Sequence, residues 1–163
     1  MARAQAEVTA TSGITATIQD YVVLTKPGIQ TLLLVAMLGA MLVAAEGAPA
    51  IELVVAMLVG GSLVSGGANA LNCYIDRDID AKMSRTRRRA TATGRISPVA
   101  ALTFGLTIST LGVLVIGLAS NWFAAGLAVV GNIYYVLVYT LWLKRSTPHN
   151  IVVGGAAGAV PPL

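Results

Sequence analysis

Charged residues are scarce in this sequence. Asp, Glu, Lys and Arg together make up 11% of its 163 residues, whereas a soluble domain usually contains about 25%. The one cysteine, Cys73, excludes an intrachain disulfide. The one histidine, His149, is interpreted as a polar loop residue beside Pro148. No signal peptide is recognisable at the start. The scarcity of charge argues against a soluble domain.

What the sequence has in place of charge is long apolar runs. Hydrophobic residues make up 56% of the chain and gather in four runs, residues 29–45, 53–71, 99–119 and 122–143. A helix needs about 20 apolar residues to cross a bilayer. Helices also satisfy their backbone polar groups within one segment, as lipid requires. The predicted fold class is therefore all-α: a polytopic transmembrane helical bundle of four full spans, with the start of a fifth.

The two ends of the chain differ from this central part. Residues 1–22 are mixed and polar, and we interpret them as a loose N-terminal cytoplasmic tail, followed by one partial transmembrane domain over residues 23–163. Residues 151–163 are apolar but too few to cross a bilayer at about 1.5 Å rise per residue. We therefore expect this chain to be the N-terminal part of a longer protein.

The basic residues predict an orientation. All 11 Lys and Arg lie within residues 3–26, 77–95 and 144–145, and four spans place these three segments on one side of the membrane. The positive-inside rule makes that side cytoplasmic. The N-terminus and the 72–97 loop are thus expected in the cytoplasm, in a multi-pass protein of the bacterial inner membrane. Since topology explains the net charge of +4, no nucleic-acid partner is expected.

A motif rich in aspartate follows the second run. The stretch NCYIDRDID places Asn72, Asp76 and Asp80 four residues apart, so on a helix they share one stripe, while Asp78 points elsewhere. Two carboxylates and an amide oxygen form a site of hard oxygen ligands. Mg²⁺ commonly takes one or two protein carboxylates together with substrate phosphates. The spacing therefore predicts a magnesium site where the second span reaches the cytoplasmic interface.

Basic residues on the same membrane face complement this motif. Arginine forks match phosphate oxygens, and the candidates for contacts with a diphosphate are Lys26, Arg85, Arg89 and Lys144. Carboxylates, Mg²⁺ and cations beside an apolar bundle imply a substrate with a diphosphate head and a lipid tail. The alternative is that these are solvated loop charges and ordinary positive-inside sequence. That alternative explains the arginines well and the aspartates poorly.

The same residues carry a resemblance to a known family. The motif N-x-x-x-D-x-x-x-D followed by R-T-x-x-R resembles the first aspartate-rich motif of the UbiA-type intramembrane prenyltransferases. Similarity to the heme-farnesylating branch of that family is carried by LTKPGIQTLL (24–33), NCYIDRDIDAKMSRTRRR (72–89), GRISPVAALTFG (94–105) and YTLWLKRSTPHNIVVGGAAGAVPPL (139–163). The resemblance covers most of the chain after about residue 20.

The resemblance implies a fold and a reaction. The fold is a bundle of nine spans around a central cavity, with a second aspartate-rich motif in its C-terminal half. The two motifs bind farnesyl diphosphate through Mg²⁺, and the farnesyl group couples to a vinyl group of heme B to give heme O. Carried over to this sequence, Asn72, Asp76 and Asp80 are the catalytic metal–diphosphate site. The diphosphate contacts are Arg85, Arg89 and Lys144, with Lys26 a weaker candidate; Asn69 and Asn150 are weak candidates on the substrate side.

The sequence also departs from the family pattern. The second aspartate-rich motif is absent, so we expect the chain to be inactive alone. Gly28 and Ala90 stand where a basic residue and a proline are expected. Three alternatives stay open: the same enzyme class acting on a quinone precursor or a chlorin, a CDP-alcohol phosphotransferase, whose longer motif is missing here, and a non-catalytic membrane subunit that binds lipid head groups.

Overall fold

The chain folds into helices. The computed structural model describes residues 2–146, 152 and 154–163, and within these ranges it contains helices and no strand. The elements in chain order are α1 (Ala2–Leu24), α2 (Pro27–Ala44), α3 (Ile51–Ile75), α4 (Arg77–Lys82), α5 (Ala90–Thr93), α6 (Pro98–Ala119), α7 (Trp122–Ile133), the π-helix η1 (Tyr134–Leu143), α8 (Lys144–Ser146) and the 3-10 helix η2 (Gly155–Ala159).

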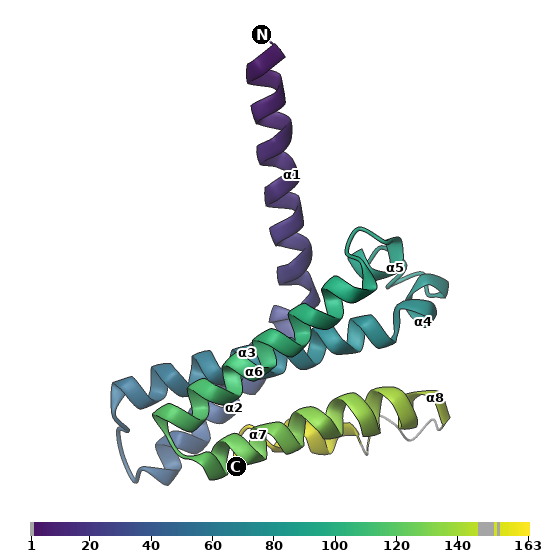
Figure 1. Ribbon diagram of the computed structural model, residues 1–163. Helices are drawn as coiled ribbons and strands as arrows, with labels where there is room; N and C mark the ends of the chain where they lie inside the picture. The colour runs from purple at the N-terminus through teal and green to yellow at the C-terminus, as the bar shows by residue number, and fades with distance from the viewer. Residues whose placement is uncertain (1, 147–151, 153) are drawn as a thin grey trace.

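Four helical stretches are long and apolar enough to cross a membrane. They are α2, α3, α6 and the continuous stretch Trp122–Ser146, which joins α7, η1 and α8. This confirms the four predicted spans. In Figure 1 the short helices α4, α5 and α8 lie toward the same end of the bundle. The basic loop and the end of the fourth span therefore share that end, as the predicted topology requires.

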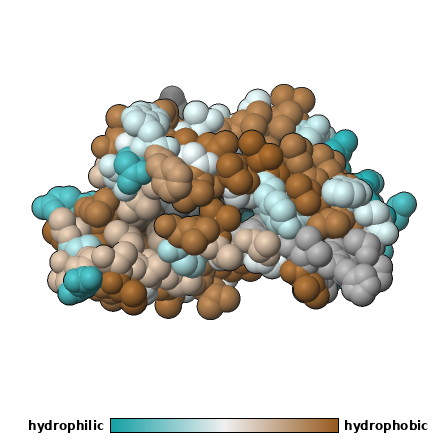
Figure 2. All heavy atoms as spheres, turned by 90° about the horizontal axis from the view of Figure 1, so that it is seen from below, coloured by the Kyte–Doolittle hydropathy of each residue, from teal (hydrophilic) through white to brown (hydrophobic). Residues whose placement is uncertain are grey.

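The outer surface suits a lipid environment. Large apolar side chains are exposed along the spans, among them Leu32, Val43 and Leu118. Figure 2 shows mostly hydrophobic residues across the face in view, with most of the hydrophilic residues toward the two ends. A soluble protein rarely exposes contiguous apolar surface on this scale. The chain is therefore an integral membrane protein.

The span boundaries follow from local capping. Pro98 occupies the first turn of α6, and the Ser97 hydroxyl accepts a hydrogen bond from the backbone N–H of Ala100. Asn121 caps α7 by accepting from the N–H of Ala124 at 2.8 Å. Such caps satisfy N–H groups that have no partner inside the helix. The Ser-Pro and Ser-Asn pairs in the sequence therefore mark helix starts.

Glycines allow α3 and α6 to pack closely and antiparallel. A Cβ at Gly112 of α6 would lie 2.6 Å from the Gly60 carbonyl oxygen of α3. A Cβ at Gly67 of α3 would lie 2.6 Å from the Gly105 carbonyl oxygen of α6. Small residues let the backbones of transmembrane helices approach in this way. Figure 1 shows the two helices side by side.

We expect the substitution Gly112→Leu to destabilise this helix pair. The new side chain has no room against the α3 backbone, and overpacking typically costs about 1–3 kcal/mol. The free energy of unfolding can be measured by detergent titration of the purified protein. Gly126→Leu is the matched control, because a Cβ at Gly126 meets nothing within 4 Å. Equal stability of the two variants would contradict close packing at Gly112.

The prediction for the N-terminal end of the chain needs correction. The expected loose tail over residues 1–22 is instead the helix α1 from Ala2 to Leu24, which projects away from the bundle in Figure 1. The segment is rich in alanine, which has the highest helix propensity. At the other end, Val152 and Gly154 are α-helical, as expected for the start of a fifth helix, and the 3-10 helix η2 follows and ends before Pro161. The glycines of η2 and the two prolines that follow disfavour continuation of an α-helix.

Candidate active site

The predicted stripe lies at the junction of α3 and α4. Asp76 stands between the two helices, and its N–H donates to the Asn72 carbonyl at 2.9 Å, while the Asp80 N–H donates to the Asp76 carbonyl at 2.8 Å. This i→i−4 bonding keeps the three residues in helical register across the junction. Asn72, Asp76 and Asp80 are all buried, with at most 2% exposure, whereas the side chain of Asp78 is 57% exposed.

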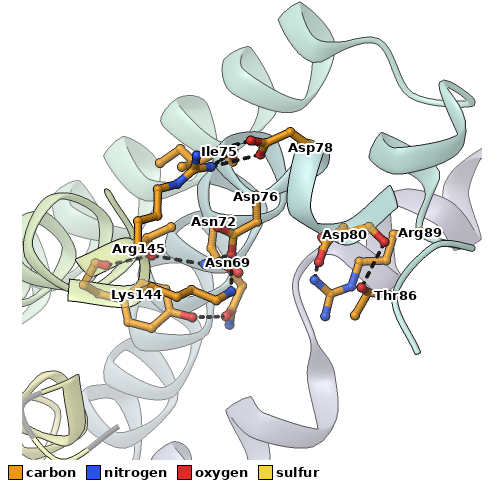
Figure 3. Close-up of polar contacts among 12 residues, drawn as sticks. Asn69, Asn72, Ile75, Asp76, Asp78, Asp80, Thr86, Arg89, Lys144 and Arg145 are labelled. Atoms are coloured by element: carbon orange, nitrogen blue, oxygen red, sulfur yellow. Dashed lines mark hydrogen bonds and ion pairs between the residues drawn. The ribbon is translucent and has the colours of Figure 1, made fainter. Parts of the chain in front are cut away.

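Asn72 and Asp76 are joined to two lysines. The Asn72 Nδ2 donates to Asp76 Oδ2 at 2.9 Å, and Asp76 Oδ2 also accepts from the ammonium of Lys144. The ammonium of Lys26 donates to Asn72 Oδ1 at 2.7 Å. Figure 3 shows Lys144 reaching toward this pair from the fourth span. Side chains from three segments therefore meet at the end of α3.

Asp80 belongs to a second, neighbouring group. The Arg89 guanidinium donates to Asp80 Oδ2 at 2.7 Å, and the Thr86 hydroxyl donates to the Asp80 carbonyl. Figure 3 shows this group beside the Asn72–Asp76 pair and separate from it, with the Asp80–Arg89 contact on the side nearer to the pair. Among the described residues, no three Asp, Glu, His or Cys side chains gather as a metal cluster. Each buried carboxylate is neutralised by a cation from another segment instead.

The oxygen atoms present fit a divalent cation. Asp76 Oδ1 is buried and has no hydrogen-bond partner among the described residues. A buried carboxylate oxygen without a partner is costly, so this atom is a candidate ligand for an ion. Asn72 Oδ1 and Asp80 are further oxygen donors nearby, which is the ligand chemistry that Mg²⁺ prefers. A cation at this site would compete with Lys144 for Asp76.

The residues predicted to contact phosphate differ in whether they touch the buried stripe of Asn72, Asp76 and Asp80. Lys26 and Lys144 touch the Asn72–Asp76 pair, and Arg89 touches Asp80. Burial lowers the pKa of Lys26, and its backbone has the left-handed φ of 55°, which strains a residue other than glycine. Arg85 is exposed and forms no ion pair with any residue that the structure describes. The geometry thus strengthens Lys26 as a candidate phosphate contact. It places Arg85 in no ion pair of the described site.

The weaker candidates also differ in their surroundings. Asn69 is buried on α3, where its Nδ2 donates to the Thr25 carbonyl at 3.1 Å and its Oδ1 accepts from the Tyr135 hydroxyl at 3.3 Å. Asn150 and His149 lie outside the described residues. Asn69 therefore links α3 to the start of α2 and to η1, one helical turn below Asn72.

An apolar cavity lies beside Asn69. It has a volume of about 310 Å³ and is lined from α2, α3, α6, α7, η1 and residues 154–163. Its wall includes Leu33, Met37, Val64, Ala68, Ile116 and Ala128. Asn69 and Tyr135 are also part of the wall. Because Asn69 precedes Asn72 by one turn, the polar group and the cavity are adjacent along α3.

Sequence reasoning missed two residues that the structure brings to this site. The Thr140 hydroxyl accepts from Asn72 Nδ2 at 3.1 Å. Arg145 pairs with Asp78 at 2.9 Å, and its hydrogen bond lowers the pKa of that exposed carboxyl. One signal was available in the sequence, because Thr140 precedes Lys144 by four residues and shares its helix face.

The polar site and the apolar cavity lie side by side in this membrane-spanning bundle. Buried carboxylates and cations at one end of a spanning bundle, adjacent to an apolar cavity, are typical of a membrane protein that handles amphiphilic molecules. The model of the UbiA prenyltransferase family matches residues 32–163. The chain belongs to the UbiA prenyltransferase family, which confirms the resemblance.

Individual relatives carry a more specific name. The chain is 55% identical over 146 residues to a protoheme IX farnesyltransferase of Symbiobacterium thermophilum (90% of this chain, 49% of the relative). It is 51% identical over 150 residues to that of Gloeobacter violaceus (92% and 49%), and 49% identical over 153 residues to that of Clavibacter sepedonicus (94% and 50%). The chain spans about half the length of these relatives. No solved structure matches it.

Proposed function

We propose that this chain forms the part of a membrane prenyltransferase that binds farnesyl diphosphate, in an enzyme that transfers the farnesyl group to a vinyl group of heme B to give heme O. The observation that carries the proposal is the position of the Asn72–Asp76 pair one helical turn from an apolar cavity. A charged head and an isoprenoid tail need these two environments side by side. The relatives are protoheme IX farnesyltransferases, which favours heme over a quinone precursor or a chlorin as acceptor.

The polar group would hold the diphosphate. Asn72, Asp76 and Asp80 would hold Mg²⁺, which supplies charge neutralisation of the diphosphate as a leaving group. Lys144 and Arg89 already lie against the two carboxylates, so a short movement of each side chain would bring it onto phosphate oxygens. Lys26 would contact the same head from the start of α2. This end of the bundle would face the cytoplasm.

The cavity would hold the farnesyl tail. Its apolar walls would exclude water from the allylic carbon, and Tyr135 and Asn69 lie in the part of the wall nearest to Asn72. The chain covers about half of its relatives' length, so we propose that turnover also needs the region that corresponds to their other half. Binding of the diphosphate head, however, begins with residues of this chain.

Two preparations test the proposal. The first is this chain in lipid nanodiscs, in which binding of farnesyl diphosphate is measured with Mg²⁺ and with EDTA. The second is a chimaera in which this chain replaces the matching half of the Symbiobacterium thermophilum relative, assayed for heme O by mass spectrometry. We expect Mg²⁺-dependent binding in both and turnover in the chimaera. A non-catalytic subunit or another acceptor is indicated if binding occurs but heme B is not converted.

Filling the cavity should separate tail binding from head binding. Ala128 lines the cavity, and Ala128→Phe is expected to weaken binding of farnesyl diphosphate about 10-fold or more while inorganic diphosphate binds as before. The measurement is a titration of both ligands in nanodiscs. Val129→Phe is the matched control, because Val129 is exposed on the neighbouring position of α7. Unchanged binding of farnesyl diphosphate in Ala128→Phe would mean that the tail lies elsewhere.

A further inference from the structure

Thr140 is a fully buried polar residue in an unusual helix. It has 0% exposure and lies in the π-helix η1, which continues the fourth span from Tyr134 to Leu143. π-helical turns are rare and occur frequently at functional sites. Here the π-helix brings Thr140 against Asn72, and Lys144 follows against Asp76.

The hydroxyl of Thr140 acts toward Asn72 only as an acceptor. Its one hydrogen is donated to the Tyr135 carbonyl at 2.9 Å, five residues earlier in the π-helix. A hydroxyl with its hydrogen committed can only accept from a second partner. The group beside it must therefore be the Asn72 nitrogen rather than the Asn72 oxygen, in agreement with the Nδ2–Oγ1 distance of 3.1 Å.

This contact fixes which way the Asn72 amide points. With Nδ2 donating to Thr140 and to Asp76 Oδ2, the oxygen Oδ1 is left facing Lys26. The other partners of Asn72 are groups that ligands would engage: Asp76 is a candidate metal ligand and Lys26 a candidate phosphate contact. Thr140 is neither, so its hydrogen bond persists when the other two change partners.

We propose that Thr140 is a positioning residue, whose hydroxyl holds the Asn72 amide with Oδ1 toward the head-group site and Nδ2 toward η1. The role in substrate binding rests on the proposed function, whereas the orientation of the amide does not. Thr140 touches neither the metal nor the substrate. It acts through Asn72, and it couples the fourth span to the stripe on α3.

The experiment compares variants that keep or remove the hydroxyl. Thr140→Val and Thr140→Ala remove it, Thr140→Ser keeps it, and Thr103→Val makes the same change at an exposed threonine of α6. All are placed in nanodiscs as full chains. The first readout, without ligand, is the NMR signal of the Asn72 side-chain amide in protein labelled with ¹⁵N-asparagine, assigned by its loss in Asn72→Asp. The second is the affinity for farnesyl diphosphate with Mg²⁺.

The expected results separate the role of Thr140 in orienting the Asn72 amide from the proposed binding of farnesyl diphosphate. Thr140→Val should shift the Asn72 amide signal, speed its hydrogen exchange and weaken binding about 10-fold, the usual effect of one lost buried hydrogen bond. Thr140→Ser and Thr103→Val should resemble the wild type.

An unchanged amide signal in Thr140→Val and Thr140→Ala overturns the proposal, as does a serine variant that behaves like valine. If neither hydroxyl-free variant folds, Thr140 is a packing residue and the proposal also fails. If the wild type binds no farnesyl diphosphate, the proposed function fails, and the amide signal still decides the role of Thr140.

Discussion

The substitution Asp76→Asn is expected to abolish Mg²⁺-dependent binding of farnesyl diphosphate. Asp76 is fully buried and accepts hydrogen bonds from Asn72 and Lys144 on one carboxylate oxygen, while its other oxygen has no hydrogen-bond partner in the part of the chain that the structure describes. An amide of the same shape keeps the packing but removes the negative charge and turns one oxygen into a donor. Loss of even an outer partner of a metal ligand typically costs 10–100-fold in metal affinity. We therefore expect a loss of more than about 100-fold.

The measurement is isothermal titration of the nanodisc-embedded chain with farnesyl diphosphate, at fixed Mg²⁺ and with EDTA. Asp78→Asn is the matched control, since Asp78 lies two residues away but is exposed and paired with Arg145. Isolated surface ion pairs contribute about 0–1 kcal/mol, so this control should bind nearly as the wild type does. Similar affinities for the two variants would remove Asp76 from the metal site.

The substitution Lys144→Met is expected to have opposite effects on the two ligands. The Lys144 ammonium neutralises Asp76 in the absence of ligand, so its removal frees the carboxylate and should tighten binding of Mg²⁺ alone. The same change removes a charged donor to the diphosphate. A hydrogen bond to a charged group contributes about 1.5–3 kcal/mol, so farnesyl diphosphate should bind roughly 10- to 100-fold more weakly.

Removal of the metal should also lower the thermal stability of the Lys144→Met variant. Breaking a buried pair leaves an uncompensated charge and can cost about 3–5 kcal/mol; because Lys144 is partly exposed, we expect a smaller loss. Thermal denaturation in EDTA should show a lowered midpoint, which Mg²⁺ restores. Lys82→Met, at an exposed lysine of α4, serves as control. A variant that loses affinity for Mg²⁺ and for diphosphate alike would show that Lys144 only supports the fold.

The spans could be predicted because lipid constrains sequence more strongly than water does. Each run of apolar residues became a helix within a few residues of its predicted ends, and Ser97 and Asn121 cap the helices that follow them. The π-helix η1 could not be predicted, because nothing in its apolar sequence distinguishes an i→i−5 from an i→i−4 hydrogen bond. The helix α1 does not follow from apolar periodicity, because its segment is mixed and polar; its alanine content favours a helix.

The candidate site was predictable where it depends on helical spacing alone. The register of Asn72, Asp76 and Asp80, and the separate direction of Asp78, follow from residues that are close in sequence. The partners from the fourth span could not be derived in the same way. The sequence predicts Lys144 as a diphosphate contact on the same membrane face, but its contact with Asp76 and the contact of Thr140 with Asn72 each join residues 68 apart. Such pairs depend on how the spans pack, which sequence periodicity does not specify.

The central claim is that a divalent ion bound by Asn72, Asp76 and Asp80 holds a diphosphate at the mouth of the apolar cavity. The most direct measurement replaces Mg²⁺ with paramagnetic Mn²⁺ and records the ³¹P relaxation of a non-hydrolysable farnesyl diphosphate analogue bound to the chain in nanodiscs. The account predicts strong ³¹P broadening in the wild type that excess Mg²⁺ reverses and that the double substitution Asp76→Asn with Asp80→Asn abolishes. Broadening that persists in the double variant, or a bound analogue whose ³¹P signals are insensitive to Mn²⁺, would contradict it.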